Sequence, residues 1–111
     1  MIRIDTGTCG ALYFHQMTGE PGDLVPTHEH TYDHVMQVQT GTIRLWTSQE
    51  AFEDMTGPAM KMVPAGVAHD VEFVTAAVVC CIHEMRDETG KVYPFAYQRT
   101  NREVAAATGR M

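Results

Sequence analysis

The chain has 111 residues, of which 44% are hydrophobic, and a formal net charge of −6 at pH 7. This length predicts a single domain, residues 1–111, with enough apolar side chains for one core. The negative charge and the lack of a basic stripe argue against a nucleic-acid partner. No apolar run is long enough to span a bilayer, and no secretory signal is visible. We therefore expect no membrane partner and a cytoplasmic location.

Short strands are predicted along most of the chain. Runs of β-prone residues lie between breaks that contain Gly or Pro: Ala11–Met17, Val35–Gln39, Thr42–Thr47, Met60–Val63, Val71–Val74, Ala77–His83 and Lys91–Tyr97. Thr40-Gly41 is typical of a tight hairpin turn, and Asp87–Gly90 predicts a second turn. One short C-terminal helix is expected at the Ala-rich stretch Arg102–Thr108. This spacing indicates an all-β sandwich or barrel.

The three cysteines, Cys9, Cys80 and Cys81, are an odd set in which two are adjacent. Neighbours on a strand face opposite ways, so Cys80 and Cys81 are poorly placed to bridge each other. We interpret all three as reduced thiols, mostly buried.

Histidines are the most informative residues. His28, His30 and His34 are spaced at i, i+2 and i+6, and His69 follows a Pro-x-Gly turn. Extended backbone sends residues two apart to the same face. The next step of four places His34 on that face again, or on an adjacent strand after a short turn. Because neutral imidazole is the commonest metal-ligating side chain, the cluster predicts a divalent metal site.

The segment around these histidines is similar to the first motif of the cupin superfamily, G-x5-H-x-H-x3,4-E-x6-G. It begins at Gly22 and ends at Gly41, and every spacing matches, with His34 where the family usually has Glu.

A second segment resembles the other cupin motif, G-x5-P-x-G-x2-H-x3-N. Pro64, Gly66 and His69 match it, whereas Gly57 lies one residue too far upstream and Phe73 replaces the Asn. Together the two motifs extend the resemblance over roughly residues 11 to 97.

The resemblance implies a double-stranded β-helix, the jelly-roll barrel of the cupins, with a metal at its centre. It implies that His28, His30 and His69 are ligands, with His34 at the position of the Glu. Loss of that anionic ligand favours an anionic substrate or a bound hydroxide. A nitrogen-rich set favours zinc, nickel or copper over manganese, and iron is also compatible.

Strand alternation places apolar residues beside the histidines. Met36 and Val38 share the parity of His34, and Val71 and Phe73 share that of His69, so all four should point into the barrel. We predict that Met36, Val38 and Phe73 line an apolar substrate pocket, although Phe73 can equally be plain core.

The remaining polar candidates carry weaker signals. His15 and His83 lie outside both motifs and are interpreted as surface or core histidines. Glu29 and Asp33 alternate away from the ligand face, where they are solvated or orient a ligand ring from behind. No general acid or base can be assigned, and the candidates are Tyr13, Tyr32, His83 and Glu84.

Three functions are compatible with this sequence. The favoured one is a metal-dependent enzyme for a small carbonyl- or carboxylate-containing molecule, of dioxygenase, isomerase, lyase or cyclase type. The alternative is a non-catalytic metal- or ligand-binding sensor module, although no helix-turn-helix is attached. A barrel that has lost its chemistry comes third, because the ligand set is intact. An open coordination position favours the enzyme, and a closed tetrahedron of histidines favours storage or structure.

We also expect a homodimer, because a small barrel exposes edge strands that would otherwise pair with other chains. The segments Met1–Asp5 and Lys91–Tyr97 carry apolar or aromatic residues that a second copy could cover.

Overall fold

The computed structural model describes residues 1–28, 30 and 32–84, and for residues 27 and 28 it describes the backbone alone. This part of the chain forms two β-sheets. Its strands are β1 (Arg3–Cys9), β2 (Leu12–Gly19), β3 (Leu24–His28), β4 (His34–Thr40), β5 (Thr42–Trp46), β6 (Phe52–Thr56), β7 (Ala59–Val63), β8 (His69–Phe73) and β9 (Ala77–Glu84). Among these residues, no helix is long and apolar enough to cross a membrane.

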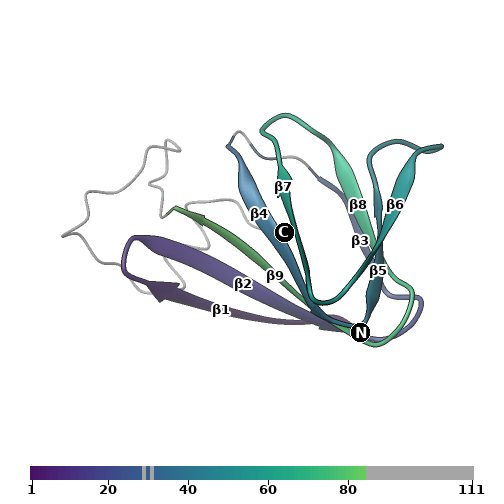
Figure 1. The fold of residues 1–111 in the computed structure, drawn as a ribbon, viewed down its shortest axis with the longest axis horizontal. Coiled ribbons are helices and arrows are strands. Elements are labelled where there is room, and N and C mark those ends of the chain that lie inside the picture. Colours follow the sequence, from purple (N-terminus) through teal and green to yellow (C-terminus); the bar gives the residue numbers. More distant parts are fainter. Residues whose placement is uncertain (29, 31, 85–111) are drawn as a thin grey trace.

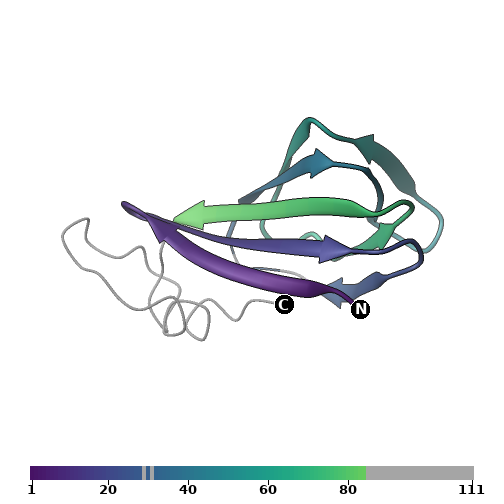
Figure 2. The same ribbon diagram turned by 90° about the horizontal axis from the view of Figure 1, so that it is seen from below.

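The two sheets face each other across the molecule (Figure 1). One has the strand order β1-β2-β9-β4-β7 and the other β3-β8-β5-β6. All paired strands are antiparallel, and β1, β2 and β9 lie side by side (Figure 2). From β2 onward the chain moves repeatedly between the two sheets, which is the winding of a double-stranded β-helix. The predicted all-β class and jelly-roll architecture are confirmed.

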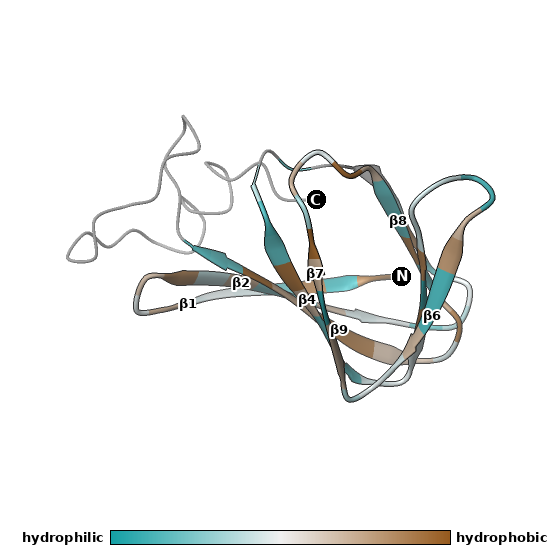
Figure 3. Cartoon of the chain, turned by 45° about the horizontal axis from the view of Figure 1, so that its top comes forward, coloured by the Kyte–Doolittle hydropathy of each residue, from teal (hydrophilic) through white to brown (hydrophobic). Residues whose placement is uncertain are grey.

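Alternating side chains fill the space between the sheets. In β2 and β4 every second residue is buried, as expected for strands with one face on a core. Figure 3 shows hydrophobic colour along the middle of these strands and hydrophilic colour at the upper end of β4. The core cluster comprises Met17, Val25, Met36, Val38, Ile43, Leu45, Met55, Val63, Val71, Phe73, Ala77, Val79 and Cys81.

The predicted turn at Thr40-Gly41 is confirmed between β4 and β5. Gly41 has a φ of +79°, a backbone conformation that side chains with a Cβ rarely adopt. A Cβ at this position would also lie 2.2 Å from the carbonyl oxygen of Ala76. Both facts require glycine here.

The strands that the sequence did not single out, β1, β3 and β6, are all edge strands. In β1 only Gly7 is buried, and in β6 only Met55. Edge strands pack against fewer neighbours, so their hydrophobic alternation is weak. The predicted turn Asp87–Gly90, strand Lys91–Tyr97 and helix Arg102–Thr108 lie outside the described residues.

Candidate metal centre

The histidines of the two motifs meet at one end of the barrel. His28 ends β3, His69 begins β8, and the two residues are direct partners in the sheet register. His34 begins β4, in the facing sheet. The segment between His28 and His34 therefore crosses from one sheet to the other. His34 therefore lies on a new strand after a short connection, which agrees with the second of the two predicted placements. That strand is in the facing sheet, however, and is not adjacent to β3.

Three imidazole rings converge at this end. The ring centroids of His30 and His34 lie 4.9 Å apart, those of His34 and His69 5.6 Å, and those of His30 and His69 6.3 Å. Imidazole nitrogens bind zinc at about 2.0–2.1 Å, which puts the centroids of rings on one ion about 5 Å apart. The structure thus brings three of the predicted ligands together. The side chain of the fourth, His28, lies outside the described residues.

The rings are more widely spaced than in an assembled metal site, because two of the three centroid distances exceed the expected value of about 5 Å. Within the described part of the chain, no three His, Cys, Asp or Glu side chains meet the spacing of bound ligands. The widest pair, His30 and His69, would have to close by about 1 Å to share an ion.

His34 has the electrostatic properties of a metal ligand. Its side chain is 4% exposed, and burial, followed by the nearby His30 and His69, lowers its pKa to about 3. The ring is therefore neutral at pH 7. Its buried Nδ1 has no hydrogen-bond partner among the described residues, which is costly for a polar atom. A borderline-soft metal ion fits this nitrogen donor set.

His69 is oriented by its own loop. Its Nδ1–H donates to the carbonyl oxygen of Val67 at 2.9 Å, and the ring is 2% exposed. This hydrogen bond selects the tautomer whose lone pair is on Nε2, an arrangement common for metal-ligating histidines.

Two hydrogen bonds join the motifs to each other. The N–H of Gly66 donates to the carbonyl of His30 at 2.8 Å, and the N–H of Ala65 donates to the Asp33 carboxylate at 2.8 Å. Asp33 is exposed, as alternation predicted, but it also fixes the turn that presents His69. These contacts couple the position of His34 to that of His69.

His15 and His83, interpreted from the sequence as surface or core residues, are both buried in the barrel. The ring of His83 lies 5.1 Å from Tyr13 and 4.7 Å from Tyr32, and the ring of Tyr32 stacks on His30 at 5.1 Å. A row of rings thus continues from the candidate ligands to His15, which lies 6.2 Å from Tyr13. Sequence reasoning missed this row, although parity along β2 already placed Tyr13 and His15 on the face of Met17.

A cleft of about 670 Å³ opens beside His34. It brings His34 together with three predicted acid–base candidates, Tyr32, His83 and Glu84. The Nδ1–H of His83 donates to the carbonyl of Glu84 at 2.6 Å, which leaves the lone pair of the neutral ring on Nε2. The remaining lining residues are Leu12, Asp33, Val35, Met62, Ala65 and Ile82.

Met36, Val38 and Phe73 point into the barrel, as parity predicted. All three are packed within the hydrophobic core, and the residues described as lining the cleft do not include them. A ligand in this cleft therefore meets Tyr32 and His83 beside His34.

All three cysteines are free thiols. Burial raises the pKa of Cys81 to about 12 and also raises that of Cys80, so neither supplies a thiolate at neutral pH. Cys80 and Cys81 are buried, as predicted for most of the thiols, and Cys9 is exposed.

No protein-family model matches the sequence, and no curated protein matches it. Solved structures do resemble the fold. A cupin superfamily protein from Desulfitobacterium hafniense is 14% identical with a TM-score of 0.68, over 76% of this chain and 77% of that one. A cupin-2 domain containing protein from Shewanella frigidimarina is 20% identical with a TM-score of 0.62, over 76% and 79%.

A third structure is an RmlC-like cupin family protein with a double-stranded β-helix fold from Methanocaldococcus jannaschii. It is 9% identical with a TM-score of 0.67, over 76% of this chain and 80% of that one. Likeness at such identities concerns the fold alone. The chain has the cupin fold that its two motifs predicted.

Proposed function

We propose that this chain is a metal-dependent enzyme that acts on a small carbonyl- or carboxylate-containing molecule. A divalent transition metal would be held by His28, His30, His34 and His69. The observation that supports this most is the meeting of three imidazoles around His34, which is neutral and buried and whose Nδ1 has no hydrogen-bond partner within the described residues. When bound, the ion would supply Lewis-acid polarisation of a ligand oxygen.

The donor set favours zinc, nickel or copper, with iron compatible and manganese least favoured. Replacement of His34 by Glu would restore an anionic ligand at the position where cupins usually carry it. We expect His34→Glu to shift metal preference toward iron or manganese in competition assays. An unchanged preference would argue that His34 is not a ligand.

Around this centre, the chain's own residues would orient the substrate in the cleft beside His34. Tyr32 and His83 offer polar ring edges there. His83 is the candidate proton acceptor, because its Nδ1–H is held by the Glu84 carbonyl and Nε2 carries the lone pair. A substrate with an oxyanionic head would compensate the charge of an all-histidine centre.

A non-catalytic metal- or ligand-binding module is the second candidate. The near-complete burial of His34 and His69 favours it, because a closed ring of histidines would leave no open coordination position. Ligand binding to the metal separates the two functions.

The test is a thermal-shift screen of small carbonyl and carboxylate compounds with metal-loaded and chelated protein. The enzyme proposal predicts hits that require metal and that disappear in Ala65→Trp, which fills the cleft from an exposed position. Ala76→Trp, in an exposed turn outside the cleft, is the matched control. Metal-independent hits, or hits that survive Ala65→Trp, would contradict a shared site. Bound metal without any hits would favour the second candidate.

We also propose that the protein is a homodimer. Ile4 on edge strand β1 is 45% exposed, and Met60 and Met62 on edge strand β7 are 64% and 54% exposed. Apolar edge strands are protected most simply by a second copy. Light scattering at micromolar concentration should exceed the 12.4 kDa mass of one chain, and a monomer mass would contradict the proposal.

A further inference from the structure

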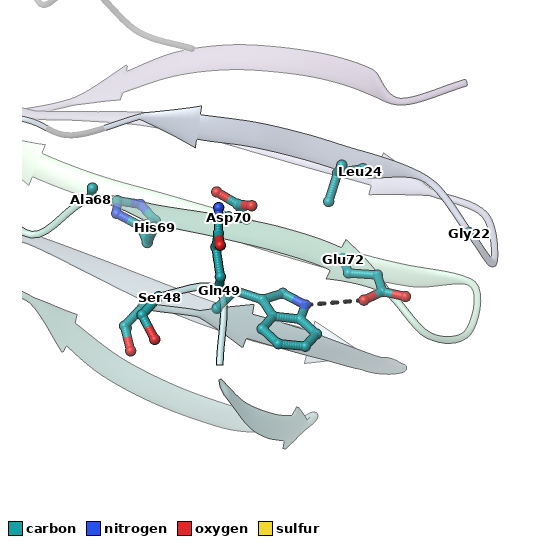
Figure 4. A pocket seen from close by; sticks show the side chains of 10 residues that line it. Gly22, Leu24, Ser48, Gln49, Ala68, His69, Asp70 and Glu72 are labelled. Atoms are coloured by element: carbon teal, nitrogen blue, oxygen red, sulfur yellow. Dashed lines mark hydrogen bonds between the residues drawn. The ribbon is translucent and has the colours of Figure 1, made fainter. Parts of the chain in front are cut away.

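A second concave surface lies on the outer face of the four-stranded sheet. This groove has a volume of about 580 Å³. Asp70 and Glu72 of β8 alternate with the inward residues of that strand and lie between Leu24 of β3 and the end of β5 (Figure 4). Trp46 and the loop after it form the second wall, and the groove reaches Ala68 and His69 at one end.

The aromatic wall is held in place before any ligand arrives. The indole Nε1–H of Trp46 donates to the Glu72 carboxylate at 3.1 Å, the bond dashed in Figure 4. The Trp46 ring also packs against Phe52 with 4.6 Å between centroids. Arg44 lies over the Phe52 ring at 4.2 Å and pairs with Asp54 at 2.8 Å. Little side-chain freedom would be lost when a ligand packs on Trp46.

The loop beside Trp46 is also fixed. The N–H of Thr47 donates to the carbonyl of Ala51 at 3.0 Å. The hydroxyl oxygen of Ser48 accepts the N–H groups of Glu50 at 3.2 Å and Ala51 at 2.9 Å. This wall is therefore a preformed turn.

The charged side chains that line the groove are all negative. Both charged side chains among its described lining residues, Asp70 and Glu72, are carboxylates. Arg44, which faces Glu72 across the β5–β8 pair, is held in an ion pair with Asp54, so one guanidinium lies beside three carboxylates. The net charge of −6 adds a negative field over the whole surface. An aromatic face next to carboxylates is the environment that attracts an ammonium or guanidinium group.

We propose that this groove binds a small organic cation, with an alkylammonium or guanidinium group against Trp46 and its charge compensated by Asp70 and Glu72. This site goes beyond the proposed metal chemistry, because Asp70 and Glu72 lie on the outer face of β8, whereas the side chain of His69 is on the inward face and is 2% exposed.

Trp46 makes the test direct, since it is the single tryptophan of the chain. Its fluorescence should change saturably with choline, and binding should weaken as salt screens the carboxylates. The neutral isostere 3,3-dimethyl-1-butanol should give no saturable change. An equal response to that alcohol or to glucose would overturn the proposal, as would no response to either choline or methylguanidinium.

Two isosteric variants test the carboxylates. Asp70→Asn and Glu72→Gln should each weaken choline binding by about threefold to tenfold, and the Gln oxygen can still accept the Trp46 N–H. Glu50→Gln, an exposed change in the adjacent loop outside the groove lining, is the matched control and should leave binding unchanged. Equal weakening in all three variants would indicate a diffuse charge effect and overturn the site. If Glu72→Gln fails to fold, Asp70→Asn decides.

A chelator separates this proposal from the metal centre. Choline binding should be the same in chelated and metal-loaded protein. Loss of choline binding on chelation would overturn an independent groove, whereas persistence of binding in a protein that holds no metal would leave the groove standing without the proposed enzyme.

Discussion

The two ends of the barrel interior are built from the same strands but have opposite chemistry. β4 begins with His34 and continues inward with Met36 and Val38, while β8 begins with His69 and continues with Val71 and Phe73. The change from hydrophilic to hydrophobic along β4 is visible in Figure 3. One end is thus a ring of imidazoles and phenols, and the other is a hydrocarbon core.

The apolar end stabilises the fold, whereas burial of the histidine end costs stability. Burial of Phe73 or Met36 lowers the free energy of the folded state, because apolar surface leaves water. Burial of a neutral imidazole such as that of His34 raises the free energy of the folded state unless each ring nitrogen has a hydrogen-bond or metal partner. The proposed metal ion would offset this cost at the Nδ1 of His34, which has no hydrogen-bond partner within the described residues.

The largest expected effect is in the apolar end. Phe73→Ala should lower the free energy of unfolding by about 3–5 kcal/mol, because it removes a fully buried ring and leaves a cavity. Under the same metal-free conditions, His34→Leu should be neutral or stabilising. Urea denaturation in the presence of chelator measures both. A loss in His34→Leu as large as that in Phe73→Ala would show that the histidine end is structural.

The next effect is a dependence of stability on pH. His34 has a folded pKa of about 3, below the ordinary 6.5, so between these values the unfolded chain binds a proton that the folded chain does not. The free energy of unfolding is therefore unaffected by this proton above pH 6.5. It falls by about 1.4 kcal/mol per pH unit as the pH decreases from 6.5 toward 3. The metal-free wild type should lose stability more steeply than His34→Leu over this window. Parallel curves would contradict a neutral buried His34.

The smallest expected effect concerns the contact that joins the two motifs. Asp33→Ala removes the acceptor of the Ala65 N–H and should cost about 0.5–1.5 kcal/mol of stability. It should also weaken metal binding by about tenfold, because His34 and His69 lose their common support. Asp33→Asn keeps an oxygen acceptor and serves as the control. Unchanged metal affinity in Asp33→Ala, measured by competition with a chromophoric chelator, would show that this contact does not position the ligands.

The sequence predicted those parts of the molecule that depend on local spacing. The strands with strong alternation, the Gly41 turn and the convergence of His30 and His34 follow from residues close together in the chain. The row of Tyr13, His15 and His83 does not, because it depends on the register in which β2 pairs with β9, where Tyr13 faces His83. Such pairing is set by contacts across the whole fold.

Strand alternation predicts the face of a residue but not its position along the barrel. It gives the face to which Met36, Val38 and Phe73 point, but not their depth along the barrel axis. These residues lie below the histidine end, in packed core, whereas the cleft opens where the strands begin and end.

The most direct test of the central claim is elemental analysis of protein purified without an affinity tag and reconstituted with zinc, nickel, copper or iron. We expect about one transition-metal ion per chain in the wild type. We expect little metal in a His30→Ala/His69→Ala double variant, and retention of the ion in Met36→Leu, which changes only the apolar end. A wild type that retains no metal after reconstitution, or a double variant that retains one ion per chain, would contradict the histidine end as a metal centre.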